Sequence, residues 1–333
     1  MGYIDYPFPL TTGIIRPVPN VRNVLNKSSI VTREKSPQGD FEQVSEPRLN
    51  HRKDRMRIFI TGSRGQLGRA LQAALTDHEI IGVDLPECDV TDRSCIDAAI
   101  AKAAPHVVIH CAALTDVDGC ARDPQAAYRV NGLGTQNVAL ACQASGAVML
   151  YVSSNEVFEG AADRPYFEFD ATNPINPYGR TKLAGEWYTR QLLTRFYIVR
   201  TAWLYAPGGR NFPHRMVQLA DERGRLQVVT DEVSSPTYVL DLAQAIDQLI
   251  ASDQYGIYHF VNEGGCSRFD FAREILRLTN RSAVPVEPTT LAAYQRASTP
   301  PPYAPLANVA GAAIGIRLRP WQEALADFLA NAD

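Results

Sequence analysis

A glycine-rich turn between an apolar strand and a helix constrains the fold of this 333-residue chain more than any other segment. In the run RIFITGSRGQLGRALQAAL, apolar residues 58–60 are typical of a short buried strand, and the leucines after the turn recur at helical spacing. Gly62 and Gly65 allow a tight turn and close approach of the backbone to a pyrophosphate, and Gly68 lets helix and strand pack closely. Since the helix N-terminus adds unpaired N–H groups and a positive dipole, the segment predicts a βα unit that binds a dinucleotide.

Two side chains of opposite charge are predicted near the ribose of that dinucleotide. A second apolar segment, residues 79–83, ends in Asp84, about 20 residues beyond the first glycine, where a carboxylate accepts a hydrogen bond from a ribose hydroxyl. Asp84 would repel a 2′-phosphate and favour NADH. Arg64, in the glycine turn, could reach that phosphate and favour NADPH. These two residues alone do not decide between NADH and NADPH as the cofactor.

Strand and helix patterns alternate from Met56 onward, which predicts a parallel, doubly wound α/β sheet of the Rossmann type. Strands are expected at residues 57–61, 79–83, 107–110, 148–152 and 197–201, and helices at 66–75, 94–103, 124–144 and 177–194. Beyond Tyr205 the alternation weakens, with shorter helices expected at 269–278 and 320–330. We therefore expect a cofactor-binding core at 56–205. Residues 206–333 are expected to form a smaller, mainly substrate-binding C-terminal lobe, with some segments returning to the core.

Residues 1–55 differ from the rest of the chain because they combine scattered prolines, polar runs and no sustained hydrophobic period. This composition predicts a mostly disordered extension. The alternative is that translation begins at Met56, directly before the first strand, so that the extension would be an artefact of start assignment. Both interpretations stay open.

Composition excludes several classes of partner. A net charge of −3 and the lack of a dense Lys/Arg stripe argue against a nucleic acid. No stretch approaches the ~18 apolar residues of a membrane span. The six cysteines are scattered, without a CxxC pair or the His spacing of a zinc site, so we expect no metal and six reduced thiols in a cytoplasmic protein.

Tyr178 and Lys182, in the run NPINPYGRTKLAGE, form a YxxxK pair downstream of the glycine turn. The spacing places the phenol and the ammonium group on one face of a helix, one turn apart. The cation is then expected to lower the tyrosine pKa from its free value of about 10. The pair alone occurs by chance in many helices. Together with the glycine turn it indicates a hydride-transfer enzyme.

Seven motifs in order carry a resemblance to a known family: GSRGQLG, CDVTD, HCAALTDVDGCARDPQAAYRVNGLGTQNVA, YVSSNEVFEG, NPYGRTKLAGE, RTAWLYAPGGRNF and SSPTYVLDLA. Over residues 56–333 the chain resembles the extended short-chain dehydrogenases/reductases, and within them the dTDP-4-dehydrorhamnose reductases. The resemblance implies NAD(P)H-dependent reduction of a nucleotide-linked 4-keto-6-deoxysugar, with NADPH favoured slightly. It implies a nucleotide sugar as the partner and allows a homodimer.

The resemblance also assigns roles to residues. Tyr178 would donate the proton, Lys182 would hold the nicotinamide ribose, and Ser154 would hydrogen-bond the substrate oxygen. The expected cofactor-binding residues are Gly62, Arg64, Gly65, Gln66, Leu67, Gly68, Asp84, Asp89, Val90, Ala112, Ala113, Tyr178 and Lys182. The expected substrate-binding residues are Val117, Asp118, Asn155, Glu156, Trp203, Arg210 and Asn211.

The chain departs from the resembled reductases at a few positions. Glu156 stands where they have an aromatic residue, as in nucleotide-sugar dehydratases, but the amide of Asn155 cannot act as the acid that dehydration needs. Glu232 replaces a usual Gln, and residues 298–302 lack an arginine often found before proline. Two alternatives therefore stay open. One is a non-catalytic NAD(P)-binding regulatory subunit, like the β-subunit of methionine adenosyltransferase, and the other is a dehydratase or epimerase.

Overall fold

The computed structural model describes residues 55–208 and 211–331, and every structural statement below concerns this part of the chain. The predicted extension up to residue 54 and the expected substrate ligand Arg210 lie outside the described residues. All described residues belong to one compact unit, Leu49–Asp333.

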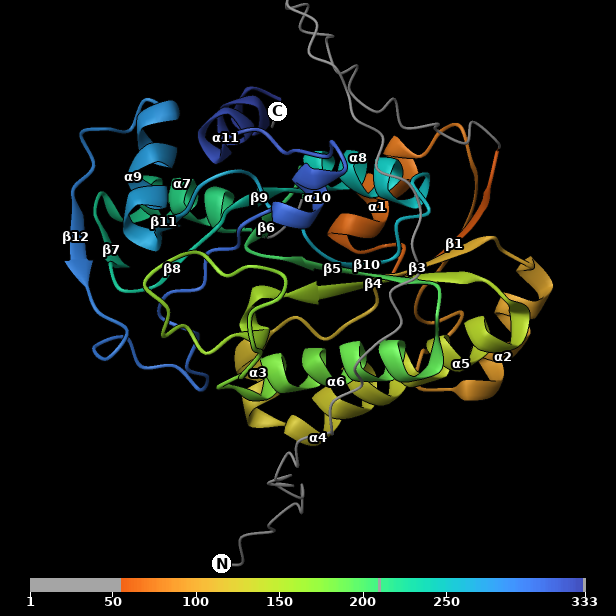
Figure 1. Cartoon of the computed structure of the whole chain (residues 1–333). Helices are drawn as coiled ribbons and strands as arrows, with labels where there is room; N and C mark the ends of the chain where they lie inside the picture. The colour runs from red at the N-terminus through yellow and green to blue at the C-terminus, as the bar shows by residue number, and fades with distance from the viewer. Residues whose placement is uncertain (1–54, 209–210, 332–333) are drawn as a thin grey trace, which may run out of the picture. The chain divides into compact units, whose positions relative to one another are not determined.

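Six parallel strands form the central sheet, in the order β10-β5-β4-β3-β1-β2 (Figure 1). Their bounds are β1 Arg57–Thr61, β2 Glu79–Val83, β3 Val107–His110, β4 Val148–Ser154, β5 Phe196–Thr201 and β10 Gly256–His259. The Rossmann-type fold class is thereby confirmed, and the five predicted strands are present with ends shifted by at most two residues. The sixth strand, β10, was not predicted. The chain moves outward from β1 in both directions along the sheet, and this reversal creates a ligand-binding crevice at the carboxyl ends of the strands.

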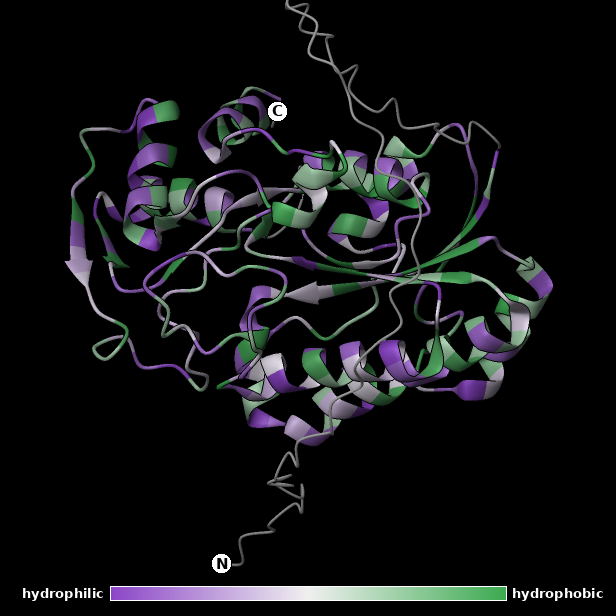
Figure 2. Cartoon of the chain, in the orientation of Figure 1, coloured by the Kyte–Doolittle hydropathy of each residue, from purple (hydrophilic) through white to green (hydrophobic). Residues whose placement is uncertain are grey.

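Helices cover both faces of the sheet, because the central strands are apolar on both sides. Helices α1 (Gln66–Ala74) and α8 (Val239–Ile250) share a core with one face (Figure 1). Helices α2 (Arg93–Ala103) and α5 (Thr135–Ser145) share a core with the other face, beside α6 (Pro177–Leu192). Figure 2 shows the hydrophobic residues along the central strands and mixed colours on the helices around them.

The single helix predicted at residues 124–144 is wrong. The chain forms α3 (Val117–Arg122), α4 (Pro124–Ala127), a π-helical turn η1 (Tyr128–Gly134) and then α5. The wider π turn lets Asn131 exchange two hydrogen bonds with the backbone of Leu114, of 2.8 and 3.0 Å, and donate another of 3.0 Å to Thr181 Oγ1. This bonding, which hydrophobic spacing does not reveal, ties the segment to the neighbouring helix α6.

The remaining elements are η2 (Asn155–Val157), β6 (Leu204–Tyr205), α7 (Phe212–Arg223), β7 (Leu226–Val229), β8 (Val233–Ser234), β9 (Thr237–Tyr238), β11 (Cys266–Ser267), α9 (Arg268–Leu278), β12 (Val286–Thr289), α10 (Val309–Ala313) and α11 (Trp321–Ala330). Most of them build a second core that contains several aromatic side chains. Val157 of η2 lies in a separate small cluster, and α10 packs against the core of the sheet. Helix α8 and strand β10 interrupt this series and lie in the sheet layers, so the boundary between core and lobe stays a prediction.

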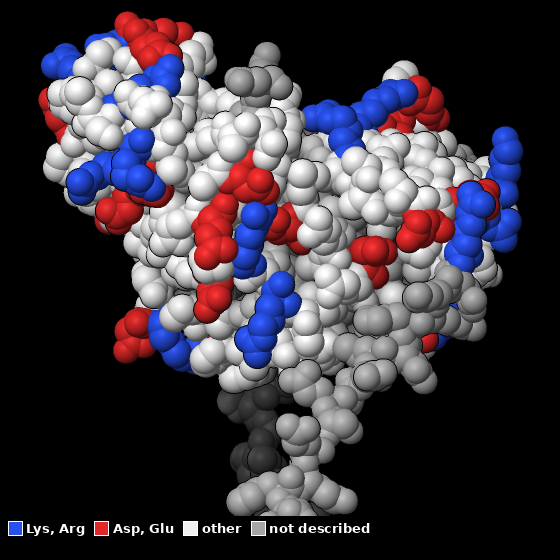
Figure 3. All heavy atoms as spheres, turned by 90° about the horizontal axis from the view of Figure 1, so that it is seen from above, with Lys and Arg blue, Asp and Glu red and all other residues white. Residues whose placement is uncertain are grey.

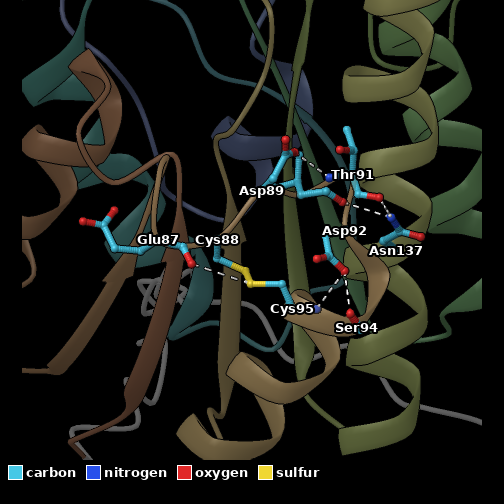
Figure 4. Close-up of a disulfide and its surroundings, with 9 residues drawn as sticks. Glu87, Cys88, Asp89, Thr91, Asp92, Ser94, Cys95 and Asn137 are labelled. Atoms are coloured by element: carbon cyan, nitrogen blue, oxygen red, sulfur yellow. Dashed lines mark hydrogen bonds between the residues drawn. A yellow bond between two sulfur atoms is a disulfide. The ribbon is translucent and has the colours of Figure 1, made fainter.

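Cys88 and Cys95 form a disulfide, so the expectation of six reduced thiols is wrong for these two residues (Figure 4). The loop after β2 turns back over the first turn of α2 and brings their Cα atoms to 5.8 Å, a separation typical of a disulfide. Four cysteines of the described part remain free: Cys111, Cys120, Cys142 and Cys266.

The surface carries scattered charges of both signs. Figure 3 shows acidic and basic side chains interspersed over one face of the molecule, with uncharged areas between them. No helix among the described residues is both long and apolar enough to cross a membrane.

Candidate active site

A cavity of about 640 Å³ opens at the carboxyl ends of strands β1 to β5. All but one of the expected cofactor-binding residues line it: Gly62, Gly65, Gln66, Leu67, Gly68, Asp84, Asp89, Val90, Ala112, Ala113, Tyr178 and Lys182. The sequence motifs that carry them are far apart in the chain, and the parallel sheet brings them to one edge.

The glycine turn forms a cradle that a larger residue would fill. Gly62 has a φ of 69°, and a Cβ there would lie 2.6 Å from the Ala112 amide nitrogen. A Cβ on Gly68 would lie 2.3 Å from the Gly62 carbonyl oxygen. Helix α1 starts after Gly65 without a side chain capping its N-terminus. The cradle therefore fits a dinucleotide phosphate, which would rest against exposed backbone N–H groups.

Arg64 is the expected cofactor-binding residue that does not line the cavity. Its guanidinium group is exposed and forms an ion pair with Glu87 and a hydrogen bond to the Leu85 carbonyl. The Asp84 carboxylate already bonds to the neighbouring backbone, because it accepts hydrogen bonds of 2.8 Å from the amides of Arg64 and Leu85. Asp84 thus fixes the turn that presents Arg64. A 2′-phosphate would have to draw Arg64 away from Glu87.

The three expected catalytic residues meet in this cavity. Ser154 is the last residue of β4, and its hydroxyl accepts a hydrogen bond of 3.2 Å from the Glu156 amide. Tyr178 and Lys182 come from the first two turns of α6. The helix starts here because Asn176 caps it and Pro177 occupies its first position.

Tyr178 does not have the lowered pKa that the YxxxK spacing predicts. Burial of the phenol, together with the nearby carboxyl group of Glu156, raises the pKa of Tyr178, and hydrogen bonding with Ser154 opposes this only in part. The spacing predicts the neighbours along the helix but not the loss of water around the hydroxyl, which penalises the phenolate. Tyr178 therefore stays protonated at neutral pH, as a proton donor must.

Lys182 is 4% exposed, and its Nζ lies 4.4 Å from the centre of the Tyr151 ring. Burial lowers the pKa of Lys182 to about 8, opposed in part by the Cys111 thiol and by Glu186. Glu186 is itself buried in an ion pair with Arg200, at 2.7 Å. The ammonium group is thus poised to lose its proton slightly above neutral pH.

Some of the expected substrate-binding residues line this cavity and others lie outside it. Val117, Asn155, Glu156 and Trp203 line the cavity. The side-chain nitrogen of Asn155, however, donates to Ser234 Oγ at 3.0 Å, so it connects η2 to β8. Trp203 has a φ of 43°, an uncommon value for a non-glycine residue and one that often marks a functional site.

Asp118 and Asn211 hold loops around the cavities. Asp118 Oδ1 accepts hydrogen bonds from Arg296 Nε at 3.1 Å and from the Ser298 amide at 2.9 Å, which closes the segment 290–302 over α3. Asn211 caps helix α7, with the His214 amide 3.2 Å from its Oδ1, and also lines a second cavity.

This second cavity, of about 1040 Å³, adjoins the first and shares Trp203, Leu204 and Arg268 with it. The Arg268 guanidinium lies 3.5 Å from the centre of the Trp203 ring and pairs with Glu232 at 3.1 Å. Sequence reasoning missed several polar residues that line this cavity: His214, Arg215, Arg223, Gln227, Arg268, Tyr294 and Arg296. One signal lies in the sequence, because Arg296 stands two residues before the stretch 298–302, which itself contains no arginine.

Comparison with known proteins gives a consistent result. Residues 56–333 match the family model described as the RmlD substrate binding domain. A dTDP-4-dehydrorhamnose reductase of Mycolicibacterium smegmatis is 40% identical over 304 residues, which cover 88% of this chain and 92% of that protein. The spore coat polysaccharide biosynthesis protein SpsK of Bacillus subtilis is 35% identical, over 82% of this chain and 96% of that protein.

A similar solved structure carries the cofactor. The dTDP-4-dehydrorhamnose reductase of Bacillus anthracis, in complex with NADP, superposes with a TM-score of 0.81 at 38% identity, covering 83% of this chain and 99% of that chain. A UDP-glucose 4-epimerase of Thermus thermophilus, in complex with NAD, has a TM-score of 0.72 at 20% identity and shows the shared fold alone.

Proposed function

The chain belongs to the family of the RmlD substrate binding domain, and on this basis we propose that it is an NADPH-dependent reductase of dTDP-4-dehydrorhamnose that forms dTDP-rhamnose. One observation carries the proposal: Ser154, Tyr178 and Lys182 line the cavity that also contains the glycine cradle. A nicotinamide cofactor and a ketone bound there would face a proton donor, a hydroxyl group and a cation.

Each of the three residues has a separate role in the proposed reduction. A bound dihydronicotinamide supplies a hydride for the carbonyl carbon. Tyr178 donates its hydroxyl proton to the carbonyl oxygen, and its raised pKa keeps that proton available at neutral pH. Ser154 donates a hydrogen bond to the same oxygen and stabilises the developing negative charge. Lys182 holds the nicotinamide ribose through its ammonium group and favours the phenolate that remains after proton transfer.

We propose that the second cavity receives the nucleotide end of the substrate. Arg215, Arg223, Arg268 and Arg296 supply cationic side chains that suit a diphosphate, and the aromatic rings along the wall suit a base. Val117, Glu156 and Trp203 would then contact the sugar between the two cavities. Calorimetric titration with dTDP alone tests this placement. We expect binding that Arg296→Ala weakens about tenfold, a loss typical of one charge-assisted hydrogen bond.

Turnover with a panel of keto-sugar nucleotides tests the function. Purified protein is mixed with NADPH and each sugar, and both cofactor absorbance and sugar product are followed. Oxidation of the cofactor with dTDP-4-dehydrorhamnose supports the reductase. A product formed without net oxidation would instead support a dehydratase or epimerase. Tight cofactor binding without any product would support a regulatory subunit.

Arg64→Ala is expected to weaken NADPH binding about tenfold while leaving the Kd of NADH within about twofold, because only the 2′-phosphate of NADPH would engage the guanidinium group. Fluorescence titration of the apo-protein with each cofactor measures both constants. Arg93→Ala is a matched control, since Arg93 is paired with Asp97 on α2 and lines neither cavity. A wild-type preference for NADH above about tenfold, roughly 1.4 kcal/mol, would contradict the assignment of NADPH.

We also propose that the enzyme works in the cytoplasm and forms a homodimer. Trp187, on helix α6, and Tyr128, on η1, are 56% and 40% exposed and offer an apolar surface for self-association. Sedimentation equilibrium measures the oligomeric state, and a purely monomeric protein at all concentrations would exclude the dimer.

A further inference from the structure

Glu156 lines the same cavity as Tyr178, although its carboxyl group has no step in the proposed reaction. Its Oε2 accepts a hydrogen bond of 2.6 Å from the side-chain nitrogen of Asn176. Asn176 is the N-cap of helix α6, and its Oδ1 accepts a hydrogen bond of 2.8 Å from the Gly179 amide. One amide side chain makes both bonds, so the carboxyl group of Glu156 orients the cap from which the helix starts.

We propose that Glu156 is a positioning residue of the reduction, which holds the first turn of α6, and with it the Tyr178 hydroxyl, in place through Asn176. The kinetic consequence rests on the proposed reductase function, whereas the structural consequence does not. Tyr178 follows Asn176 by two residues, and Pro177 between them has a fixed φ, so the orientation of the cap is passed directly to the tyrosine.

The backbone of Glu156 supports the same turn. A Cβ on Gly179 would lie 2.0 Å from the Glu156 carbonyl oxygen, which shows how closely the two segments pack. Asn176 is 2% exposed, and its side-chain nitrogen has one further partner, the Thr299 carbonyl at 3.1 Å. Without the Glu156 carboxyl group, this buried amide would lose its shorter hydrogen bond and part of its orientation.

The charge of Glu156 also acts on Tyr178. Burial raises the pKa of Glu156 to about 7, and the hydrogen bond from Asn176 opposes this shift in part. The nearby carboxylate of Glu232 raises the pKa further, by a smaller amount. The charged or titratable groups that face it are Tyr178 on α6, Cys120 on α3, Glu232 after β7, Arg268 on α9 and Arg296 in the segment 290–302. An ionised Glu156 opposes formation of the Tyr178 phenolate, so proton donation should weaken as the pH rises through about 7.

Three variants separate the hydrogen bond from the charge. Glu156→Ala removes both, and we expect kcat to fall about tenfold, because a displaced acid loses its alignment with the ketone. Glu156→Gln keeps an oxygen for Asn176, so we expect its kcat at neutral pH to stay several-fold above that of Glu156→Ala and to show no decline through pH 7. Asn176→Ser keeps a capping oxygen and removes the donor to Glu156, so it should resemble Glu156→Ala. If both act through one contact, the double variant Glu156→Ala/Asn176→Ser should be no slower than either single variant.

Amide hydrogen exchange gives a readout that needs no turnover. We expect faster exchange at Gly179 in Glu156→Ala and wild-type exchange in Glu156→Gln, with the Kd of NADPH unchanged within about twofold in both. Glu159→Ala is the matched control, since Glu159 accepts a hydrogen bond from Asn173 but is exposed and lines neither cavity. The inference is overturned if Gly179 exchange is the same in all variants, or if Glu156→Gln is as slow as Glu156→Ala. Absence of turnover in the wild type would instead contradict the reductase function and leave the exchange result to decide the positioning role.

Discussion

Tyr178→Phe is expected to lower kcat by about 100-fold or more while changing the Kd of NADPH by no more than about twofold. The substitution removes only the hydroxyl oxygen, so the ring keeps its place in the first turn of α6. The proton for the alkoxide must then come from water, which is a weaker acid than the phenol and is not held in position by the helix. Because ionisation of Glu156 weakens proton donation by the wild type as the pH rises through about 7, the fold-loss should be larger at pH 6 than at pH 7.5.

Stopped-flow or steady-state oxidation of NADPH measures this prediction, and fluorescence titration gives the cofactor affinity. Tyr188→Phe is the matched control on the same helix, because the Tyr188 hydroxyl bonds to the Tyr128 hydroxyl, at 2.8 Å, and lines neither cavity. The control should retain nearly full turnover. Near-normal turnover in Tyr178→Phe would exclude the tyrosine as the acid.

The sheet was predictable from the sequence to the extent that its strands are buried on both faces. Strand β3, for example, is a run of four buried residues that begins with Val107, Val108 and Ile109, a pattern that propensity and hydropathy both favour. Strand β10 is only half buried along its first two residues and lies at the sheet edge, so its sequence GIYH carries a weak signal. Helix α8 has a clear apolar face but was not predicted. It lies among loops rich in Gly, Pro and Ser, so its helical repeat of apolar residues did not stand out from the surrounding sequence.

The candidate site was predictable where a motif carries it in a continuous run. The glycine turn and the YxxxK pair fall into this class. Arg268 and Arg296 do not, since the positions of helix α9 and of the segment 290–302, which carry them, depend on two-residue strands and long loops. The disulfide between Cys88 and Cys95 depends on how one loop folds back on a helix, which spacing alone does not specify.

The acidity of the site residues lies beyond sequence reasoning for a physical reason. Residue spacing predicts which charges are neighbours along a helix, but burial decides how much each charge costs. For Tyr178, burial and the Glu156 carboxyl group outweigh the expected influence of Lys182. The Lys182 ammonium lies over the Tyr151 ring, a neighbour from strand β4 that the spacing along the helix does not reveal.

Lys182→Ala is expected to raise the Kd of NADPH about tenfold and to lower kcat about 100-fold, because it removes both a charge-assisted hydrogen bond to the ribose and the cation that favours the phenolate. The effect on binding separates it from Tyr178→Phe. Lys102→Ala is the control, since Lys102 lies in the last turn of α2, is exposed and lines neither cavity. Lys182→Arg should keep part of the cofactor affinity, although its planar group fits the ammonium site poorly.

The pH dependence of cofactor binding tests the same residue. Burial lowers the pKa of Lys182 to about 8, so the ammonium is present at pH 6 to 7 and is lost as the pH rises through about 8. The Kd of NADPH for the wild type should therefore increase above pH 8 and approach that of Lys182→Ala, whose own Kd should stay level over this range. Glu156→Gln, which concerns proton donation rather than ribose binding, should follow the wild-type binding curve. A wild-type Kd that is flat from pH 6 to pH 9.5 would show that the ammonium of Lys182 does not hold the cofactor.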